Sequence, residues 1–264
     1  MTRILGLSGR KQSGKNTVCN FLHGMEMLSV GLISDFKFDD SGKLIVPTTT
    51  VDGQGNEKTE YGVFDLERDK TDPNFFDYMA NTVWPFIKAY SFADILKMKV
   101  CVDILGLKYE QCYGTDEEKN TESNILWSVL PTPNSEIRSK KMTAREVMQY
   151  IGTDIFRKIY PNVWADSTIR RITAEGTALA VVTDVRFPNE VKAIQDAGGK
   201  VIRLTRNSES DDQHSSEVAL DKEQYDWDNF DEVIDNKEME VSACNELVYS
   251  MLQKWGWVEG YEFK

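Results

Sequence analysis

The sequence is poor in cysteine, and it lacks any run that looks like a leader or a membrane span. Its four cysteines include no C-x-x-C pair, and the first residues lead straight into "TRILGLSG", without a basic segment followed by an apolar one. No stretch approaches the roughly 18 apolar residues of a membrane span. From these absences we expect a soluble protein of the reducing cytoplasm whose cysteines are buried thiols.

Basic residues are outnumbered by acidic ones. The chain has 31 Lys and Arg against 43 Asp and Glu, which gives a formal net charge of −12. This balance argues against a nucleic-acid binder or an anionic-membrane binder, because both use basic surface to neutralise phosphate. An anionic substrate must therefore meet a local basic pocket.

Histidine is also scarce, with only two in the chain. His214 stands in "DQHSSE" without a clear nucleophile beside it. We therefore predict a structural or phosphate-proximal role for His214 rather than acid–base catalysis.

What the sequence does contain is an alternation of short apolar runs with amphipathic segments. "RILGLSG" leads into a glycine-rich loop and then into residues 15–28, whose apolar side chains recur at helical spacing. Later, "ALAVVTDVRFPNE", "PNEVKAIQDAGG" and "KVIRLTR" read as strand, helix and strand. The alternation predicts an α/β fold with a parallel central sheet flanked by helices, in a single domain over residues 1–264.

Two segments interrupt that alternation. Residues 31–71 place β-prone residues on both sides of "DGQGN", which predicts an inserted hairpin that forms a lid or a dimer contact. Residues 90–165 are mostly helical, and Thr143 followed by Glu146 is a capping-box signal for one of these helices. We expect this second segment to bind substrate and to act as a lid.

The stretch "GRKQSGKNT", residues 9–17 and here called the phosphate loop, nearly matches the phosphate-binding pattern G-x-x-x-x-G-K-[ST]. Asn16 stands where the pattern has Ser or Thr, and the hydroxyl comes one place later, at Thr17. The alternative is a glycine turn with a solvated lysine. Because the loop directly follows the first strand, where glycine turns and helix N-termini meet phosphate, we predict a working loop in which Lys15 reaches the β- and γ-phosphates.

Asp184 closes the apolar run "ALAVVTD". An acid at the end of a neighbouring strand is the usual second part of such a site, where it holds magnesium directly or through water. The alternative is an aspartate that caps the next turn. We predict that Thr17 and Asp184 hold Mg²⁺.

Five segments in this order resemble the deoxynucleoside monophosphate kinases of bacteriophages. They are "GRKQSGKNT", "SFADILK", "REVMQYIGTDIFR", the downstream Trp164 and "VVTDVRFPNEVKAIQDAGGKVIRLTR". The resemblance covers roughly residues 1–30 and 90–240. In that family the loop usually reads G-K-D-T, so the late hydroxyl is normal there, whereas Asn16 in place of Asp is a departure.

The resemblance implies that ATP phosphorylates a deoxynucleoside monophosphate by direct in-line transfer, with magnesium bridging the ATP phosphates. Residues expected to bind ATP are Gly9, Lys11, Ser13, Gly14, Lys15, Asn16 and Thr17. Residues expected around the deoxynucleotide are Asp94, Arg145, Gln149, Gly152, Thr153, Trp164, Asp184, Arg186 and Glu190. Residues expected to be catalytic are Lys15, Asp184, Arg186, Arg145 and Arg157.

Elementary chemistry is compatible with these roles. The acceptor phosphate is already ionised, so the transfer needs positioning and charge neutralisation more than a strong base. The planar fork of Arg186 suits bidentate phosphate binding, and it lies on the side of Asp184 if that strand continues. Arg157 is four residues past Thr153 on an expected helix and can face the same cleft.

Ordinary structural roles compete with several of these assignments. Arg145 and Arg157 on helices are more often solvated or salt-bridged, and Gln149 fits an exposed helix position. Trp164 fits a core aromatic, and Asp94 fits either a substrate contact or a helix cap.

Two other functions stay open. One is a different small-molecule kinase with such a loop, for example a dephospho-coenzyme A kinase-like enzyme. The other is a nucleotide-binding regulatory module without turnover, which Asn16 favours. The expected partners are ATP and a deoxynucleoside monophosphate, with no nucleic acid and no membrane. The resemblance adds a homodimer and, for a phage-encoded chain, the host cytoplasm.

Overall fold

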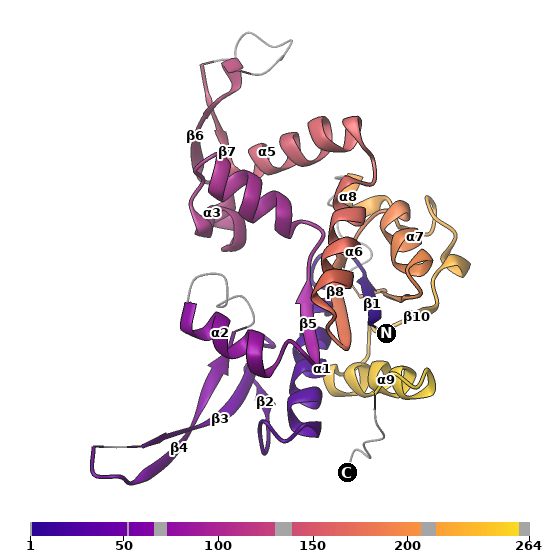
Figure 1. Cartoon of the computed structure of the whole chain (residues 1–264). Coiled ribbons are helices and arrows are strands. Elements are labelled where there is room, and N and C mark those ends of the chain that lie inside the picture. Colours follow the sequence, from indigo (N-terminus) through magenta and orange to yellow (C-terminus); the bar gives the residue numbers. More distant parts are fainter. Residues whose placement is uncertain (1, 52, 66–72, 130–138, 207–214, 259–264) are drawn as a thin grey trace. The chain divides into compact units, whose positions relative to one another are not determined.

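The computed structural model describes residues 2–51, 53–65, 73–129, 139–206 and 215–258 (Figure 1). His214 lies outside these residues, as do the last residues of the predicted 31–71 insertion. The chain divides into two compact units, and each is described by itself. The first unit comprises Met1–Tyr90 and Arg171–Lys264, and the second comprises Ser91–Arg170.

The first unit is built on a five-stranded sheet whose paired strands all run parallel. In spatial order the strands are β10 (Glu232–Ile234), β9 (Lys200–Leu204), β1 (Arg3–Ser8), β8 (Leu179–Val185) and β5 (Ile87–Tyr90). β1 is central, so the segment that follows it leaves from the middle of the sheet edge. The parallel sheet predicted from the alternation of apolar runs and helices is confirmed.

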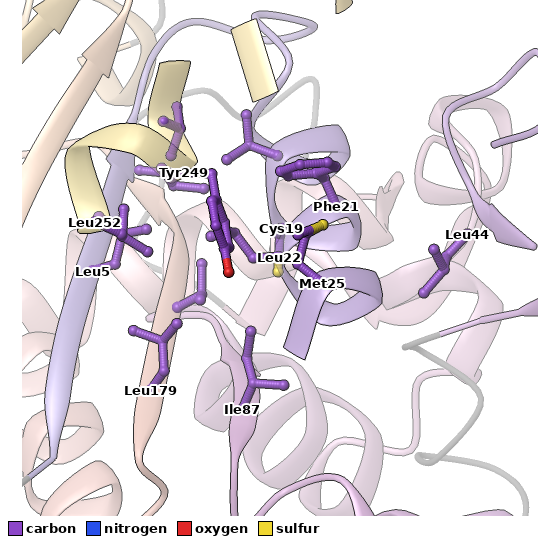
Figure 2. Close-up of a cluster of buried hydrophobic side chains, with 14 of the residues drawn as sticks. Leu5, Cys19, Phe21, Leu22, Met25, Leu44, Ile87, Leu179, Tyr249 and Leu252 are labelled. Carbon is purple, nitrogen blue, oxygen red and sulfur yellow. The ribbon is translucent and has the colours of Figure 1, made fainter. Parts of the chain in front are cut away.

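Helices cover both faces of this sheet. α1 (Lys15–Ser29) and α9 (Val241–Lys254) enclose a hydrophobic core on one face. Figure 2 shows Leu5 of β1, Leu22 of α1 and Leu252 of α9 among the buried side chains of this core. On the other face α7 (Pro188–Asp196) approaches β1 closely, because a Cβ at Gly6 would lie 2.7 Å from Ile194 Cδ1.

The remaining helices of this unit are short. They are α2 (Pro73–Thr82), α8 (Ser215–Val218) and the 3₁₀ turn Trp227–Asn229. α6 (Val163–Glu175) begins in the second unit and ends in the first. No helix in the described part of the chain is both long enough and apolar enough to span a bilayer.

The predicted insertion forms an antiparallel sheet of β2 (Lys37–Phe38), β3 (Leu44–Val51) and β4 (Glu57–Phe64). β3 and β4 pair from Leu44 opposite Phe64 to Val51 opposite Glu57, so the hairpin around "DGQGN" is confirmed. Leu44 and Phe64 are buried in the same core as α1. The base of the hairpin is therefore part of the first unit, and a lid role stays a prediction.

The second unit is mostly helical, with a small antiparallel sheet of β6 (Glu122–Leu126) and β7 (Lys141–Thr143). Its helices are the π-helix η2 (Ile95–Ile104), α3 (Tyr109–Tyr113), α4 (Asp116–Lys119), α5 (Ala144–Gln149) and the π-helix η4 (Tyr150–Arg157), with a 3₁₀ turn at Trp127–Val129. The predicted capping box is confirmed, since Glu146 N donates to Thr143 Oγ1 and Thr143 N donates to Glu146 Oε2. The π-helices are a difference from the sequence expectation, which gave ordinary helices.

His23 on α1 is fully buried and predicts a pH-dependent stability. Its Nδ1 bonds Cys19 O at 2.8 Å, while Nε2 has no hydrogen-bond partner among the described residues. Burial lowers the pKa of His23 to about 4, against the hydrogen bond to Cys19 O, which raises it. The unfolded chain therefore binds one proton more than the native chain between the two pKa values, and stability falls as the pH falls through that window.

We expect wild type to lose about 2 kcal/mol more unfolding free energy than His23→Leu between about pH 7 and about pH 5. Urea unfolding of both proteins at both pH values measures this difference. Equal losses in the two proteins would show that His23 does not titrate in this way.

Candidate nucleotide-binding site

The candidate site lies at the carboxyl edge of the parallel sheet in the first unit. In the strand register Ser8, the last residue of β1, lies opposite Val185 of β8 and Arg203 of β9. The phosphate loop leaves β1 at this point and its last three residues begin α1. In open parallel sheets this edge is where ligands bind.

The backbone of the phosphate loop is tightly folded. Gly9 and Gly14 have φ of 154° and 101°, and a Cβ at Gly9 would lie 2.8 Å from Leu204 O. No side chain caps α1 at Gly14, and the first turn of α1 holds no acidic residue. The N–H groups at the start of α1 are thus suited to an anion.

Lys15 folds back into this loop and is only 8% exposed. Its Nζ donates to Gly9 O and Arg10 O at 2.7 Å each, and to Ser13 Oγ at 3.3 Å. Burial, together with the charges of Arg186 and Arg203, lowers the pKa of Lys15 to about 7, and the charge of Asp184 opposes this shift. An anionic ligand in this loop would stabilise the charged form of Lys15.

A buried ion-pair network lies beneath the loop. Asp221 accepts from Arg10 Nε at 3.2 Å and from Arg203 Nη2 at 3.3 Å, and Arg203 Nη1 donates to Ser8 Oγ at 3.1 Å. Arg203 is 2% exposed, and its Nε has no hydrogen-bond partner among the described residues. The sequence interpretation missed all three charged residues. The available signal was an arginine inside the otherwise apolar strand "KVIRL".

Arg186 is joined to the loop through a second acid. Glu217 of α8 accepts from Lys11 N at 3.0 Å and forms an ion pair with Arg186 Nη1. Glu217 is buried, whereas Arg186 is partly exposed and can reach a ligand. β8 ends at Val185, one residue before Arg186. The expected placement of Arg186 on the same side as Asp184 required the strand to continue through Arg186, and it does not. Sequence reasoning did not single out Glu217.

Glu190, expected near the acceptor, is 1% exposed. Its Oε2 accepts from the backbone N of Arg186 at 2.7 Å and of Phe187 at 3.0 Å. These contacts fix the start of α7 and the backbone of Arg186. Glu190 therefore positions Arg186 in this structure.

The two expected magnesium ligands have different surroundings. Asp184 lies in β8, and its charge raises the pKa of Lys15, so the carboxylate is close to the amine. Thr17 lies against the turn before β3, because a Cβ at Gly42 would be 2.8 Å from Thr17 Oγ1. Among the described residues no group of three His, Cys, Asp or Glu side chains could hold a metal. Magnesium needs few carboxylates when phosphates supply the other ligands.

The second unit holds the other predicted residues. Arg145 donates to Asp116 Oδ1 at 2.8 Å and to Asn120 Oδ1 at 3.0 Å. In this structure Arg145 therefore has the salt-bridged role that the sequence left open as an alternative to catalysis. Asp94 stands at the N-terminus of η2, where its side chain makes no capping hydrogen bond to that helix, and it accepts a long hydrogen bond of 3.5 Å from the Tyr113 hydroxyl. Gln149 ends α5, and η4 carries Thr153 and Arg157 half-buried, one turn apart.

Two further predicted residues of this unit contact each other. Trp164 Nε1 donates to Gly152 O at 3.0 Å, and Trp164 is 4% exposed. A Cβ at Gly152 would lie 2.6 Å from Leu96 Cδ2, so a larger residue there would displace the end of the Leu96 side chain. Both residues have a packing role in this structure, as the core-aromatic alternative for Trp164 anticipated.

Comparison with known proteins points to one family. The family model described as "Deoxynucleotide monophosphate kinase" matches residues 3–240. A protein of Acanthamoeba polyphaga mimivirus named "Putative deoxynucleotide monophosphate kinase" is 33% identical over 146 residues, which is 49% of this chain and 67% of that protein. The matched span of the family model contains the phosphate loop, Asp184, Arg186 and every candidate residue of the second unit.

Proposed function

Because the chain belongs to the deoxynucleotide monophosphate kinase family, we propose that it transfers the γ-phosphoryl group of ATP to a deoxynucleoside monophosphate. The products are ADP and a deoxynucleoside diphosphate. The observation that carries the proposal is Lys15, a buried amine held inside a glycine loop at the carboxyl edge of a parallel sheet.

The charges around the loop support this assignment. Lys15, Arg10, Arg186 and Arg203 gather at one edge of a chain whose net charge is −12. Such a local set of cations is what an acidic protein needs in order to bind polyphosphate. The N–H groups of the loop and of the α1 N-terminus would hold the phosphates, and Lys15 would exchange its carbonyl partners for phosphate oxygens.

Asp184 fits the role of the protein ligand of Mg²⁺, because its carboxylate lies at the same edge beside Lys15. When bound, the metal ion neutralises phosphate charge. The Thr17 hydroxyl fits that role only if it turns away from Gly42. Arg186 would contact the acceptor phosphate, with its orientation set by Glu217 and Glu190.

For the second unit we propose contacts with the deoxynucleotide from Arg145, Gln149, Thr153 and Arg157, as the family resemblance implies. Arg145 would have to exchange Asp116 for phosphate, and the half-exposure of the pair allows this. A cytoplasmic location and a homodimer are proposed on the resemblance alone.

A 2′-deoxy preference is the test of the substrate class. We expect kcat/KM for dGMP to exceed that for GMP by about tenfold or more, which is the discrimination a fitted pocket achieves against one extra hydroxyl. Coupled ADP release with a panel of deoxynucleotides, ribonucleotides and dephospho-coenzyme A measures this preference. Equal values for dGMP and GMP would contradict it, and turnover with dephospho-coenzyme A alone would favour the other kinase.

Asn16 gives a separate prediction, because it is exposed at the start of α1. If this position only orients a water or the acceptor, Asn16→Asp should change kcat by less than about tenfold, or ~1.4 kcal/mol. We expect superimposable rate curves against magnesium concentration for the two proteins. A shift to lower magnesium in Asn16→Asp would show a metal-binding role, because hard cations favour charged oxygen ligands.

A further inference from the structure

A cavity of ≈ 410 Å³ lies beside the phosphate loop within the first unit. Its walls are the first two turns of α1, the first turns of α9 and residues 38–42 of the insertion. Thr17 lines it, and Thr17 is also the last residue of the phosphate loop. The cavity therefore begins where the proposed phosphate site ends.

The insertion supplies a fixed wall of this cavity. The Asn20 side chain donates to Gly42 O at 2.8 Å, and Gly42, with φ 79°, leaves no room for a Cβ beside Thr17. Asp39 Oδ1 accepts from the backbone N of Ser41 and of Lys43, both at 2.9 Å. These bonds hold the turn against α1 before any ligand arrives.

Asn245 of α9 points to the kind of ligand. It lines the cavity and is only 2% exposed. A side-chain amide offers both a hydrogen-bond donor and an acceptor, so Asn245 can pair with a ligand that presents both. Phe21 and Phe38, whose ring centroids are 6.5 Å apart, also line the cavity and add apolar surface. Aromatic walls with one precise donor and acceptor suit a planar heterocycle.

The charge of the cavity decides which end of a nucleotide it takes. Asp39, Asp40 and Glu246 line it, whereas the cations are at the loop. The Ser41 hydroxyl and the backbone of Lys43 lower the pKa of Asp39, which keeps that rim charged at neutral pH. Phosphate is repelled here and attracted at Lys15. Only the uncharged end of a nucleotide fits.

We propose that residues 38–42 of the insertion and the start of α9 bind the nucleoside part of the phosphate donor, with Asn245 hydrogen-bonding its base. This inference rests on the proposed function. It makes the inserted segment part of the donor site, so that the phosphates lie in the loop and the base lies between α1, α9 and the insertion turn.

Binding of ATP and of inorganic tripolyphosphate, measured by calorimetry, tests the proposal. The variants are Asn245→Leu, which removes the amide, and Ser41→Trp, which fills the mouth from an exposed turn position. We expect both to weaken ATP binding at least about tenfold, since a lost buried hydrogen bond and a blocked cavity each cost that much, and to bind tripolyphosphate like wild type. Asn81→Leu on α2 and Ser29→Trp at the end of α1 are matched exposed controls that should bind both probes normally.

The outcomes separate this inference from the proposed function. If wild type binds ATP and both variants bind it equally well, the cavity is not the nucleoside site. Parallel loss of ATP and tripolyphosphate binding would also overturn the inference, because the loop itself would then be damaged. A wild type that binds neither probe overturns the proposed function. If Asn245→Leu fails to fold, ATP binding by Ser41→Trp alone tests the inference, because residue 41 is exposed and lies outside the core.

Discussion

Lys15→Ala should abolish phosphoryl transfer and leave the fold intact. The amine is the cation nearest the loop carbonyls, and the loss of one preorganised group of this kind costs on the order of 10²–10³-fold in kcat. Burial contributes most to lowering the pKa of Lys15 to about 7, which means that the folded protein disfavours the charged form of this amine. Removing the amine should therefore not destabilise the fold. Coupled ADP release and circular dichroism measure the two effects.

Lys192→Ala is the matched control for this substitution. Lys192 is an exposed lysine of α7 that pairs with Asp196 in the next turn, and its removal should change neither property. A folded Lys15→Ala protein with the turnover of wild type would remove the phosphate loop from the mechanism.

Asp184→Asn should lower the rate on the order of 10²-fold or more and weaken its dependence on magnesium. Two effects add in the same direction. The variant loses the carboxylate proposed to hold the metal ion, and it loses the charge that raises the pKa of Lys15, so less of the amine is protonated. Steady-state rates over a magnesium titration measure both.

Asp196→Asn, on the exposed surface of α7, should leave rate and titration unchanged and serves as the control. If Asp184→Asn also leaves them unchanged, the aspartate is a structural residue at the end of β8 and the metal must be held elsewhere.

Local patterns predicted the elements that carry the site. An apolar run, a glycine loop and helical spacing fixed β1, the phosphate loop and α1, because each of these signals lies within a few neighbouring residues. Pro188 followed by Glu190 marked the start of α7 in the same way, since both are residues of a helix N-terminus.

Contacts between distant residues were beyond such patterns. Arg10 and Asp221 are separated by 211 positions, and Lys11 and Glu217 by 206, so no spacing rule brings them together. The cavity wall at Gly42 depends likewise on how the insertion turn packs on α1. Helical spacing also cannot distinguish the π-helix η4 from an α-helix, because the two differ by about one residue per turn.

Trp164 shows the limit of residue type as a guide to role. Its position in the resemblance favoured a substrate contact, whereas its indole bonds Gly152 O in the interior of the second unit. An aromatic residue can fill a core or line a ligand pocket equally well. Only the burial of Trp164 in the structure distinguishes the core role from the pocket role.

We propose that this chain phosphorylates deoxynucleoside monophosphates through the phosphate loop, and identifying the reaction products tests this. The direct measurement is to incubate the protein with ATP, magnesium and each deoxynucleoside monophosphate in turn, and to separate the nucleotides by chromatography. We expect at least one deoxynucleoside monophosphate to give its diphosphate in an amount equal to the ADP formed. ADP release without a deoxynucleoside diphosphate, or no product with any of the acceptors, would contradict it.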